Sequence, residues 1–147
     1  MKTPILETSR LWLKPLKEED APGAFLWTGD PKVSWYMRYE THESLEDTKQ
    51  WLREEEKQLD SDLLYDFGFH KKDNDELIGS GGLTFNQQQG IWELGCNLRR
   101  DCWNQSYGTE AAAAILSFAE NTLHIHRVMA RHAKDNTASG RVLEKNG

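Results

Sequence analysis

Apolar and polar residues alternate near the start of the chain, and this period of two predicts a strand over Leu6–Leu16. The apolar side of that strand holds Leu11, Leu13 and the ring of Pro15. Three acidic residues, Glu18–Asp20, follow it, and acids suit the first turn of a helix because they face the positive end of its dipole. We expect this short helix to end near Gly29-Asp30-Pro31.

A longer helix is predicted over Ser44–Asp60, where one apolar stripe recurs every seven residues, at Leu45, Leu52 and Leu59. At its start, Ser44 and Asp47 resemble a capping box, in which each side chain accepts a hydrogen bond from the other residue's backbone N–H. The stripe predicts that one face of the helix packs against the rest of the protein.

Three strands joined by polar turns are predicted next, over Leu64–His70, Leu77–Phe85 and Ile91–Leu98. The first of them carries three aromatic residues on one face, Tyr65, Phe67 and Phe69. Glycines at 79, 81 and 82 are expected to interrupt the second strand. A polar loop over Asn86–Gly90 turns the second strand into the third.

The last third of the chain alternates between helix and strand. We expect a helix over about Gly108–Leu123, a strand over Arg127–Ala133 and a helix over Asn136–Asn146. The full order, β-α-α-β-β-β-α-β-α, is neither that of a doubly wound sheet nor that of a barrel. It predicts one α/β (α+β) domain over residues 1–147, with a mixed sheet and helices on both of its faces.

Composition and charge exclude several classes of protein. Apolar residues make up 37% of the chain and charged residues 29%, which excludes a fibre and a disordered tail. No uncharged apolar run approaches the ~20 residues of a membrane span, and no signal peptide is visible, so no membrane partner is expected. A net charge of −6 makes the chain a poor general binder of nucleic acid.

The cysteine and histidine residues have no spacing typical of a disulfide scaffold or a metal site. Cys96 and Cys102 are too few for a disulfide scaffold and lack the spacing of metal ligands, so the reducing cytoplasm is the default location. Cys96 alternates with apolar neighbours and is expected to be a small buried residue. His124 and His126 have no further ligands near them in sequence, so we expect solvated side chains rather than a metal site.

The stretch Leu94–Ala114 carries the most chemistry, because a strand ends near Leu98 and a helix begins at Ser106–Thr109. A helix start offers unpaired backbone N–H groups and the positive end of the dipole, which together suit a phosphate. Gly108 would let a ligand approach the backbone closely. The alternative is an ordinary helix start in which Ser106 or Thr109 only caps the helix.

Five segments also follow one another in a recognisable order: Arg10–Leu16 with Glu19-Asp20-Ala21, Leu77–Leu83, Glu93-Leu94-Gly95, Trp103–Ala111, and Asn136–Gly147. In this order they resemble the GCN5-related N-acetyltransferases (GNAT), and within that superfamily the ribosomal-protein alanine N-acetyltransferase branch. The resemblance covers nearly the whole chain. It implies a mostly antiparallel sheet with helices on both faces.

The resemblance implies acetyl-CoA as cosubstrate, bound in a V-shaped cleft where the strand Ile91–Leu98 bends away from its neighbour. The family's pyrophosphate pattern, Gln/Arg-x-x-Gly-x-Gly/Ala, falls on residues 103–108, with Ser106 in place of the middle glycine. A serine at this position tolerates a right-handed helical backbone, but it is expected to narrow the room for the pyrophosphate. The residues implied to hold the cosubstrate are Asn97, Leu98, Trp103, Asn104, Gln105, Ser106, Tyr107, Gly108, Thr109 and Asn136.

The chemistry that the resemblance implies is direct attack of an amine on the thioester, without an acyl-enzyme. A backbone N–H near Asn97 and Leu98 would polarise the thioester carbonyl. Glu93 is the nearest motif carboxylate that could take the amine's proton, and the alternative is a structural partner for a cation. Ser139 would give the leaving thiolate a proton or a hydrogen bond, and the alternative is that Asn136 and Ser139 are only cap and first-turn residues of their helix.

The acceptor is expected to be a primary amine, and the sequence does not choose between a protein N-terminus, a polyamine and another small amine. Five residues form either the acceptor side of the cleft or part of the core: Trp27, Trp35, Tyr36, Met37 and Tyr39. No metal is implied. The rival interpretation is a non-catalytic CoA-binding or protein-interaction module, which Ser106 and the lack of a clear base favour mildly.

In the family a pair of strands normally follows the last helix, beyond the position of Gly147 in this sequence. Without those strands we expect the edge of Arg127–Ala133 to lie open. An open edge invites pairing with another chain, so a homodimer is a further expectation.

Overall fold

The computed structural model describes residues 3–34 and 41–130. Its elements follow in the order β1 (Leu6–Glu7), β2 (Leu11–Pro15), η1 (Glu18–Asp20), α1 (Ala21–Thr28), α2 (Pro31–Ser34), α3 (Leu45–Lys57), β3 (Leu64–Lys71), β4 (Leu77–Asn86), β5 (Ile91–Leu98), η2 (Arg100–Cys102), α4 (Tyr107–Asn121) and β6 (Val128–Ala130). The predicted helix Asn136–Asn146 and the end of the predicted strand Arg127–Ala133 lie outside the described residues.

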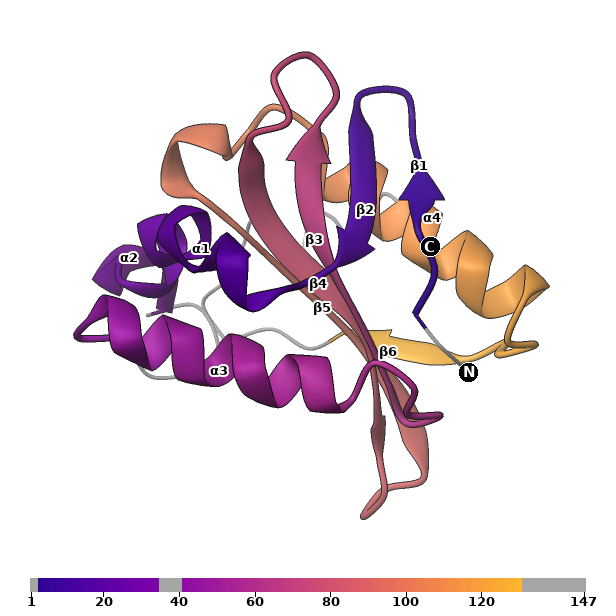
Figure 1. Ribbon diagram of the computed structural model, residues 1–147. Helices are drawn as coiled ribbons and strands as arrows, with labels where there is room; N and C mark the ends of the chain where they lie inside the picture. Colours follow the sequence, from indigo (N-terminus) through magenta and orange to yellow (C-terminus); the bar gives the residue numbers. More distant parts are fainter. Residues whose placement is uncertain (1–2, 35–40, 131–147) are drawn as a thin grey trace.

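One sheet holds all six strands in the order β1-β2-β3-β4-β5-β6 (Figure 1). The first five pair antiparallel and β6 pairs parallel with β5. Helices α1, α2 and α3 lie on one side of this curled sheet, and α4 crosses the other (Figure 1). The predicted mixed, mostly antiparallel sheet with helices on both faces is confirmed. None of the helices in the described part of the chain is long and apolar enough to cross a membrane.

The first predicted strand is wrong as a single strand, because the chain turns back within it. Leu6 pairs with Leu13 in a hairpin of β1 and β2. The turn is closed by Thr8, whose backbone N–H donates to the Leu11 carbonyl and whose hydroxyl oxygen accepts from the Leu11 N–H, each at 2.9 Å. A threonine hydroxyl in this role is a local turn signal that hydrophobic periodicity does not contain. The alternation itself is confirmed, since Leu11 and Leu13 are fully buried.

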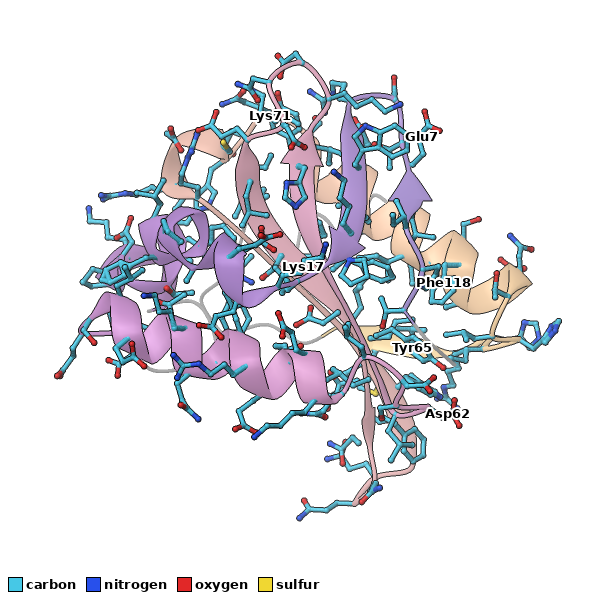
Figure 2. The ribbon with its side chains drawn as sticks, in the orientation of Figure 1. Glu7, Lys17, Asp62, Tyr65, Lys71 and Phe118 are labelled. Carbon is cyan, nitrogen blue, oxygen red and sulfur yellow. The ribbon has the colours of Figure 1, made fainter. Side chains whose placement is uncertain are left out.

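The main core lies between α4 and the aromatic face of β3. Tyr65, Phe67 and Phe69 are buried as predicted. Phe118 of α4 packs edge-on against two of them, with its ring centroid 5.5 Å from that of Tyr65 and 5.9 Å from that of Phe67 (Figure 2). The contact face of α4 is otherwise made of small residues and one isoleucine: Ala111, Ala112, Ile115 and Ala119. Small side chains let the helix lie close to the sheet.

On the other side of the sheet, α3 buries Thr48 and Leu52, whereas Leu45 stays 38% exposed. The Ser44 hydroxyl accepts from the Asp47 N–H as predicted, but the Asp47 carboxylate accepts from the Glu43 N–H, one residue earlier than a capping box requires. The expected box is therefore only half formed. The helix also ends at Lys57, three residues before the predicted end at Asp60.

The glycines of β4 do not interrupt it, and this expectation is corrected by the structure. The strand runs unbroken from Leu77 to Asn86 and pairs with β3 and β5. A Cβ atom on Gly82 would lie only 1.8 Å from the backbone oxygen of Tyr65. Glycine is thus required here because the β3 backbone comes closer than any side chain allows.

We predict that Gly82→Ala lowers the free energy of unfolding by about 1–3 kcal/mol, because β3 and β4 must move apart to admit the methyl group. The matched control is Gly23→Ala in α1, where the added Cβ meets only Leu77 at 3.5 Å. Alanine at that position should stabilise by up to about 1 kcal/mol, since it favours helix. Urea denaturation of both variants tests this, and equal effects at the two sites would contradict it.

Candidate functional site

Helix α4 begins at Tyr107 after a cap residue, Ser106, whose backbone is left-handed (φ 65°, ψ 11°). Ser106 thus departs from the right-handed helical backbone that a serine tolerates. Its hydroxyl makes no capping hydrogen bond to the helix, so it does not serve as the cap that the alternative interpretation required. Asn104, two residues earlier, is also left-handed with φ 62°. The loop thus takes the backbone shape that the family's glycine supplies without strain.

Glu110, in the first turn of α4, fastens the helix start to the β1–β2 turn. Its carboxylate accepts from the Thr8 hydroxyl at 2.5 Å and from the backbone N–H and the Nε of Arg10, both at 2.7 Å. Burial by itself would raise the pKa of Glu110, but the hydrogen bonds from Thr8 and Arg10 outweigh it, so the pKa lies below the ordinary value. Sequence reasoning missed this residue, because its partners lie about a hundred positions away.

Two cations lie close to the start of α4. The Arg10 guanidinium stacks 4.1 Å from the centroid of the Tyr107 ring and donates to the Gln105 carbonyl at 3.1 Å. The Lys71 ammonium lies 6.0 Å from the same ring. Cations are disfavoured at a helix N-terminus unless an anion lies between them and the helix dipole. Glu110 already provides a carboxylate for Arg10, so Lys71 is the cation whose charge favours a further anion at this end of α4.

Two other residues of the predicted pyrophosphate segment hold the loop in place. The Trp103 indole N–H donates to the Leu98 carbonyl at 2.9 Å, and the Gln105 side-chain amide donates to the Asp101 carbonyl at 2.8 Å. Trp103 also packs against the small cluster around Trp27. Tyr107 and Gly108 are buried in the first turn of the helix, which Thr109 continues.

Strand β5 presents different groups on its face and on its edge. Within the described residues, β6 pairs with β5 at Trp92, Glu93 and Leu94, and β5 continues beyond this over Gly95–Leu98. The Arg99 N–H donates to the Ile78 carbonyl of β4 at 2.7 Å. Because backbone groups alternate along a strand, those of Asn97 also face β4, whereas those of Leu98 face the opposite edge. Of the two residues expected to offer backbone contacts, Asn97 and Leu98, only Leu98 directs its backbone groups toward that edge.

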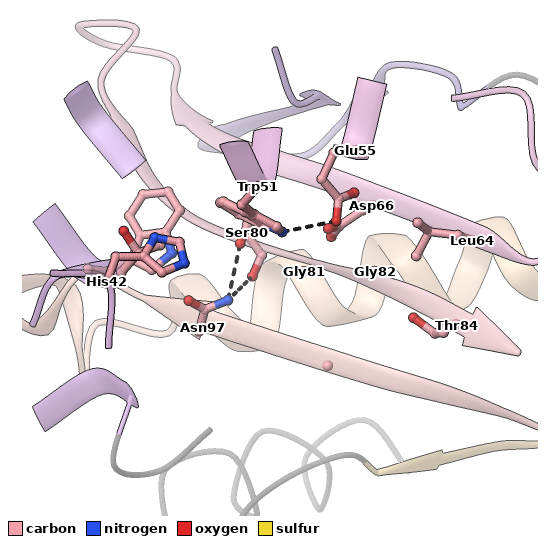
Figure 3. Close-up of a pocket in the computed structure, with 13 residues that line it drawn as sticks. His42, Trp51, Glu55, Leu64, Asp66, Ser80, Gly81, Gly82, Thr84 and Asn97 are labelled. Atoms are coloured by element: carbon pink, nitrogen blue, oxygen red, sulfur yellow. Dashed lines mark hydrogen bonds between the residues drawn. The ribbon is translucent and has the colours of Figure 1, made fainter. Parts of the chain in front are cut away.

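A cavity of about 300 Å³ lies on the face of the sheet opposite α4, between α1, α3 and the strands β3–β5 (Figure 3). Its lining is built from Trp27, Thr28, His42, Trp51, Glu55, Leu64, Asp66, Ser80, Gly81, Gly82, Thr84, Gly95 and Asn97. Trp27 therefore belongs both to a buried cluster and to the cavity wall. The other four aromatic and methionine candidates, Trp35, Tyr36, Met37 and Tyr39, lie outside the described residues.

The Asn97 side chain points from β5 into this wall. Its amide nitrogen donates to both the carbonyl and the hydroxyl of Ser80, each at 3.1 Å (Figure 3). A carbonyl can only accept, so the Ser80 carbonyl fixes which end of the amide is nitrogen. The Asn97 Oδ1 atom is buried and has no hydrogen-bond donor among the described residues.

Aromatic rings form one wall of the cavity. His42 and Trp51 meet edge to face with centroids 6.1 Å apart, and His42 Nδ1 lies 2.7 Å from the Thr48 hydroxyl. Burial lowers the pKa of His42, although the charge of Asp47 acts in the opposite direction, so the ring is neutral at pH 7. The Trp51 indole N–H donates to Glu55 at 3.1 Å.

Glu93, the sequence candidate for proton transfer, is 8% exposed and pairs across the sheet with Thr84 of the cavity wall. Its carboxylate accepts from the Asn86 side chain at 3.1 Å. The other catalytic candidate, Ser139, and the cosubstrate candidate Asn136 lie outside the described residues. No group of three potential metal ligands occurs within residues 3–34 and 41–130. Cys96 is half-buried against the core.

Comparison with known proteins shows which family this chain matches. Residues 10–147 match the family model for the acetyltransferase (GNAT) domain. The chain is 28% identical over 145 residues to the uncharacterized N-acetyltransferase YoaA of Bacillus subtilis, a match that covers 98% of this chain and 82% of that protein.

Two solved structures share the fold. An acetyltransferase of the GNAT family from Bacillus anthracis superposes with a TM-score of 0.84 at 24% identity, covering 98% of this chain and 82% of the other. RimL, a ribosomal L7/L12 α-N-protein acetyltransferase in complex with coenzyme A, superposes with a TM-score of 0.81 at 16% identity, covering 97% and 82%. At these identities the likeness supports the fold alone.

We predict that Glu110→Gln lowers the free energy of unfolding by about 1–2 kcal/mol at pH 7, because charged hydrogen bonds to Thr8 and Arg10 are lost. The expected loss of unfolding free energy is modest because the Arg10 side chain is 43% exposed and solvent screens its charge. Because folding lowers the pKa of Glu110, its contribution is present above the ordinary glutamate pKa and is lost as pH falls through the folded value.

The measurement for Glu110→Gln is urea denaturation at a series of pH values between 3 and 7. The control is Glu54→Gln, which affects an exposed pair with Lys57 and a hydrogen bond from the exposed Gln50 side chain and should cost less than about 0.5 kcal/mol. A difference between wild type and Glu110→Gln that stays constant down to the lowest pH would refute the argument.

We also predict that Ser106→Gly raises the free energy of unfolding by about 0.5–1 kcal/mol. Glycine relieves the left-handed strain, which outweighs its greater freedom in the unfolded chain, and no capping bond is lost. Ser117→Gly is the control, because it lies in the right-handed body of α4 and should destabilise by about 0.5 kcal/mol. Thermal and urea denaturation measure both, and the same sign at both positions would show that Ser106 is unstrained.

Proposed function

This chain belongs to the acetyltransferase (GNAT) family and is an N-acetyltransferase, and from that premise we propose that it acetylates a primary amine by direct attack on acetyl-CoA. The acceptor in this proposal is a protein N-terminus or a small amine. The observation that carries the proposal is the position of β5, whose edge at Leu98 leads toward the start of α4 and whose face forms the wall of the cavity. One strand can then bring the cosubstrate and the acceptor together.

The start of α4 suits the pyrophosphate of acetyl-CoA. The left-handed backbone of Ser106 turns the chain so that the first N–H groups of the helix, from Tyr107 to Thr109, can address an anion. Gly108 leaves room for the phosphates, and Lys71 and Arg10 add positive charge near the same turn. We assign Asn104 and Gln105 to the loop that shapes this site, and Trp103 to its support.

The pantetheine arm would run along the open edge of β5, where the backbone of Leu98 faces outward. A backbone N–H at this edge would donate to the thioester oxygen as negative charge develops on it. Asn136, from the sequence pattern, is proposed as a further contact to the cosubstrate.

The proposed chemistry is a single acyl transfer. The neutral amine nitrogen bonds to the thioester carbon, the carbon–sulfur bond breaks, and the electron pair leaves with sulfur as the CoA thiolate. The proton released by the amine passes to Glu93, directly or through water, and Ser139 is proposed to relay a proton from water to the thiolate, so that its hydroxyl is restored. Glu93 pairs across the sheet with Thr84, which lines the cavity, and this supports a proton path from an acceptor bound there.

We predict that acetyl-CoA stabilises the folded protein by about 2.7 kcal/mol at a hundred times its dissociation constant. Gly108→Asp should abolish this effect, because a carboxylate in the first turn of α4 repels the phosphates. Gln89→Asp is the control, since Gln89 is exposed in the turn between β4 and β5 and the substitution adds the same charge. Calorimetry and melting curves with and without acetyl-CoA provide the measurement.

A wild-type chain that shows no binding of acetyl-CoA at millimolar concentration would overturn the proposed function. The acceptor is identified by turnover with a panel of N-terminal peptides, diamines and monoamines, with free thiol as the product measured. Binding of acetyl-CoA without turnover of any amine would overturn the proposed acceptor class.

A further inference from the structure

We propose that the Asn97 side chain binds the acceptor, with its Oδ1 atom accepting a hydrogen bond from the attacking amine. This inference rests on the proposed function, and it assigns a role to a side chain where the sequence pattern implicated only the backbone. It starts from a buried polar atom whose hydrogen-bonding capacity the described structure leaves unused.

The orientation of the Asn97 amide is determined by its surroundings. Its nitrogen donates to the Ser80 carbonyl and hydroxyl, both at 3.1 Å, and the carbonyl cannot be a donor. The opposite orientation would set two acceptor oxygens against each other. Oδ1 is therefore held on the side away from Ser80, where no donor among the described residues reaches it (Figure 3).

A buried acceptor without a donor is unfavourable, and proteins seldom keep one unless a ligand or an ordered water completes it. Asn97 lines the cavity of about 300 Å³, which corresponds to roughly ten water molecules at ~30 Å³ each and holds a small amine or one terminal residue. Oδ1 can only accept, so it cannot polarise the thioester oxygen. The group that it binds must carry an N–H or an O–H, and an amine does.

Leu98, the next residue of β5, supports the role proposed for Asn97. Asn97 directs its side chain to the cavity face of β5, whereas the backbone of Leu98 faces the edge proposed for the thioester. An amine bound by Asn97 thus lies one residue along β5 from the backbone edge at Leu98, which is proposed to polarise the thioester carbonyl. The aromatic wall of Trp51 and His42 lines the same cavity. Asn97 is in this way a binding residue that also orients the attacking nitrogen.

The test compares Asn97→Ala with Asn97→Asp, using the amine from the panel that the wild type acetylates best. Alanine removes both the acceptor and the donor, whereas aspartate keeps an acceptor oxygen, replaces the donor to Ser80 by a second oxygen and adds a negative charge. We expect kcat/KM for the amine to fall about tenfold or more in Asn97→Ala, which corresponds to the loss of one hydrogen bond of about 1.4 kcal/mol. We expect a smaller loss in Asn97→Asp. The affinity for acetyl-CoA should change less than twofold in both.

Three outcomes would overturn the inference. If Asn97→Asp is as impaired as Asn97→Ala, the residue acts through its bond to Ser80 and is structural. If acetyl-CoA affinity falls while the KM of the amine is unchanged, Oδ1 serves an amide of the cosubstrate. If Asn97→Ala matches the wild type and the control Asn121→Ala, Oδ1 is not used. Wild-type protein that binds acetyl-CoA but acetylates no amine would refute the proposed function instead, and this inference with it.

Discussion

The packing of α4 across the aromatic face of β3 is the contact on which the site depends. Phe118 lies edge-on against Tyr65 and Phe67, and the alanines among the other contact positions let the helix approach the sheet. This apolar contact fixes where the axis of the helix runs. Its first turn must then come to the end of β5, where the Glu110 carboxylate ties it to the β1–β2 turn. The anion site proposed for the start of α4 therefore depends on core packing at one end of a helix and not on the loop alone.

The elements of the fold were largely predictable, because most carry a clean periodicity. The boundaries of β5 and the aromatic face of β3 follow from alternation with a period of two, and the start of α3 follows from its serine cap. The predictions fail where a single polar contact, or the close approach of two backbones, decides the local structure. Thr8 closes a turn inside an apparently continuous strand, and Gly82 marks a close approach of two strands rather than a break. Neither event alters the hydrophobic pattern.

The candidate site was predictable only in part, for a related reason. The segment at residues 103–108 stands out in the sequence, but the left-handed backbone of Ser106 is imposed by the turn into α4 and not by any preference of serine. Glu110 and the cavity wall depend on residues far apart in the chain. The wall joins Trp51 of α3 to Ser80 of β4 and Asn97 of β5, and local sequence cannot show that these three meet.

The alternation of side chains and backbone groups along β5 explains how one strand can serve both the cavity and the sheet edge. Successive residues of a strand send their side chains to opposite faces and their backbone groups to opposite edges. Asn97 and Leu98 are consecutive, so one contributes a side chain to the cavity while the other contributes its backbone to the edge near Trp103. A shift of β5 by one residue against β4 would exchange these roles and turn Asn97 away from Ser80. The register of β4 and β5 is therefore a condition for the chemistry proposed for this cleft, as much as the identity of the residues that line it.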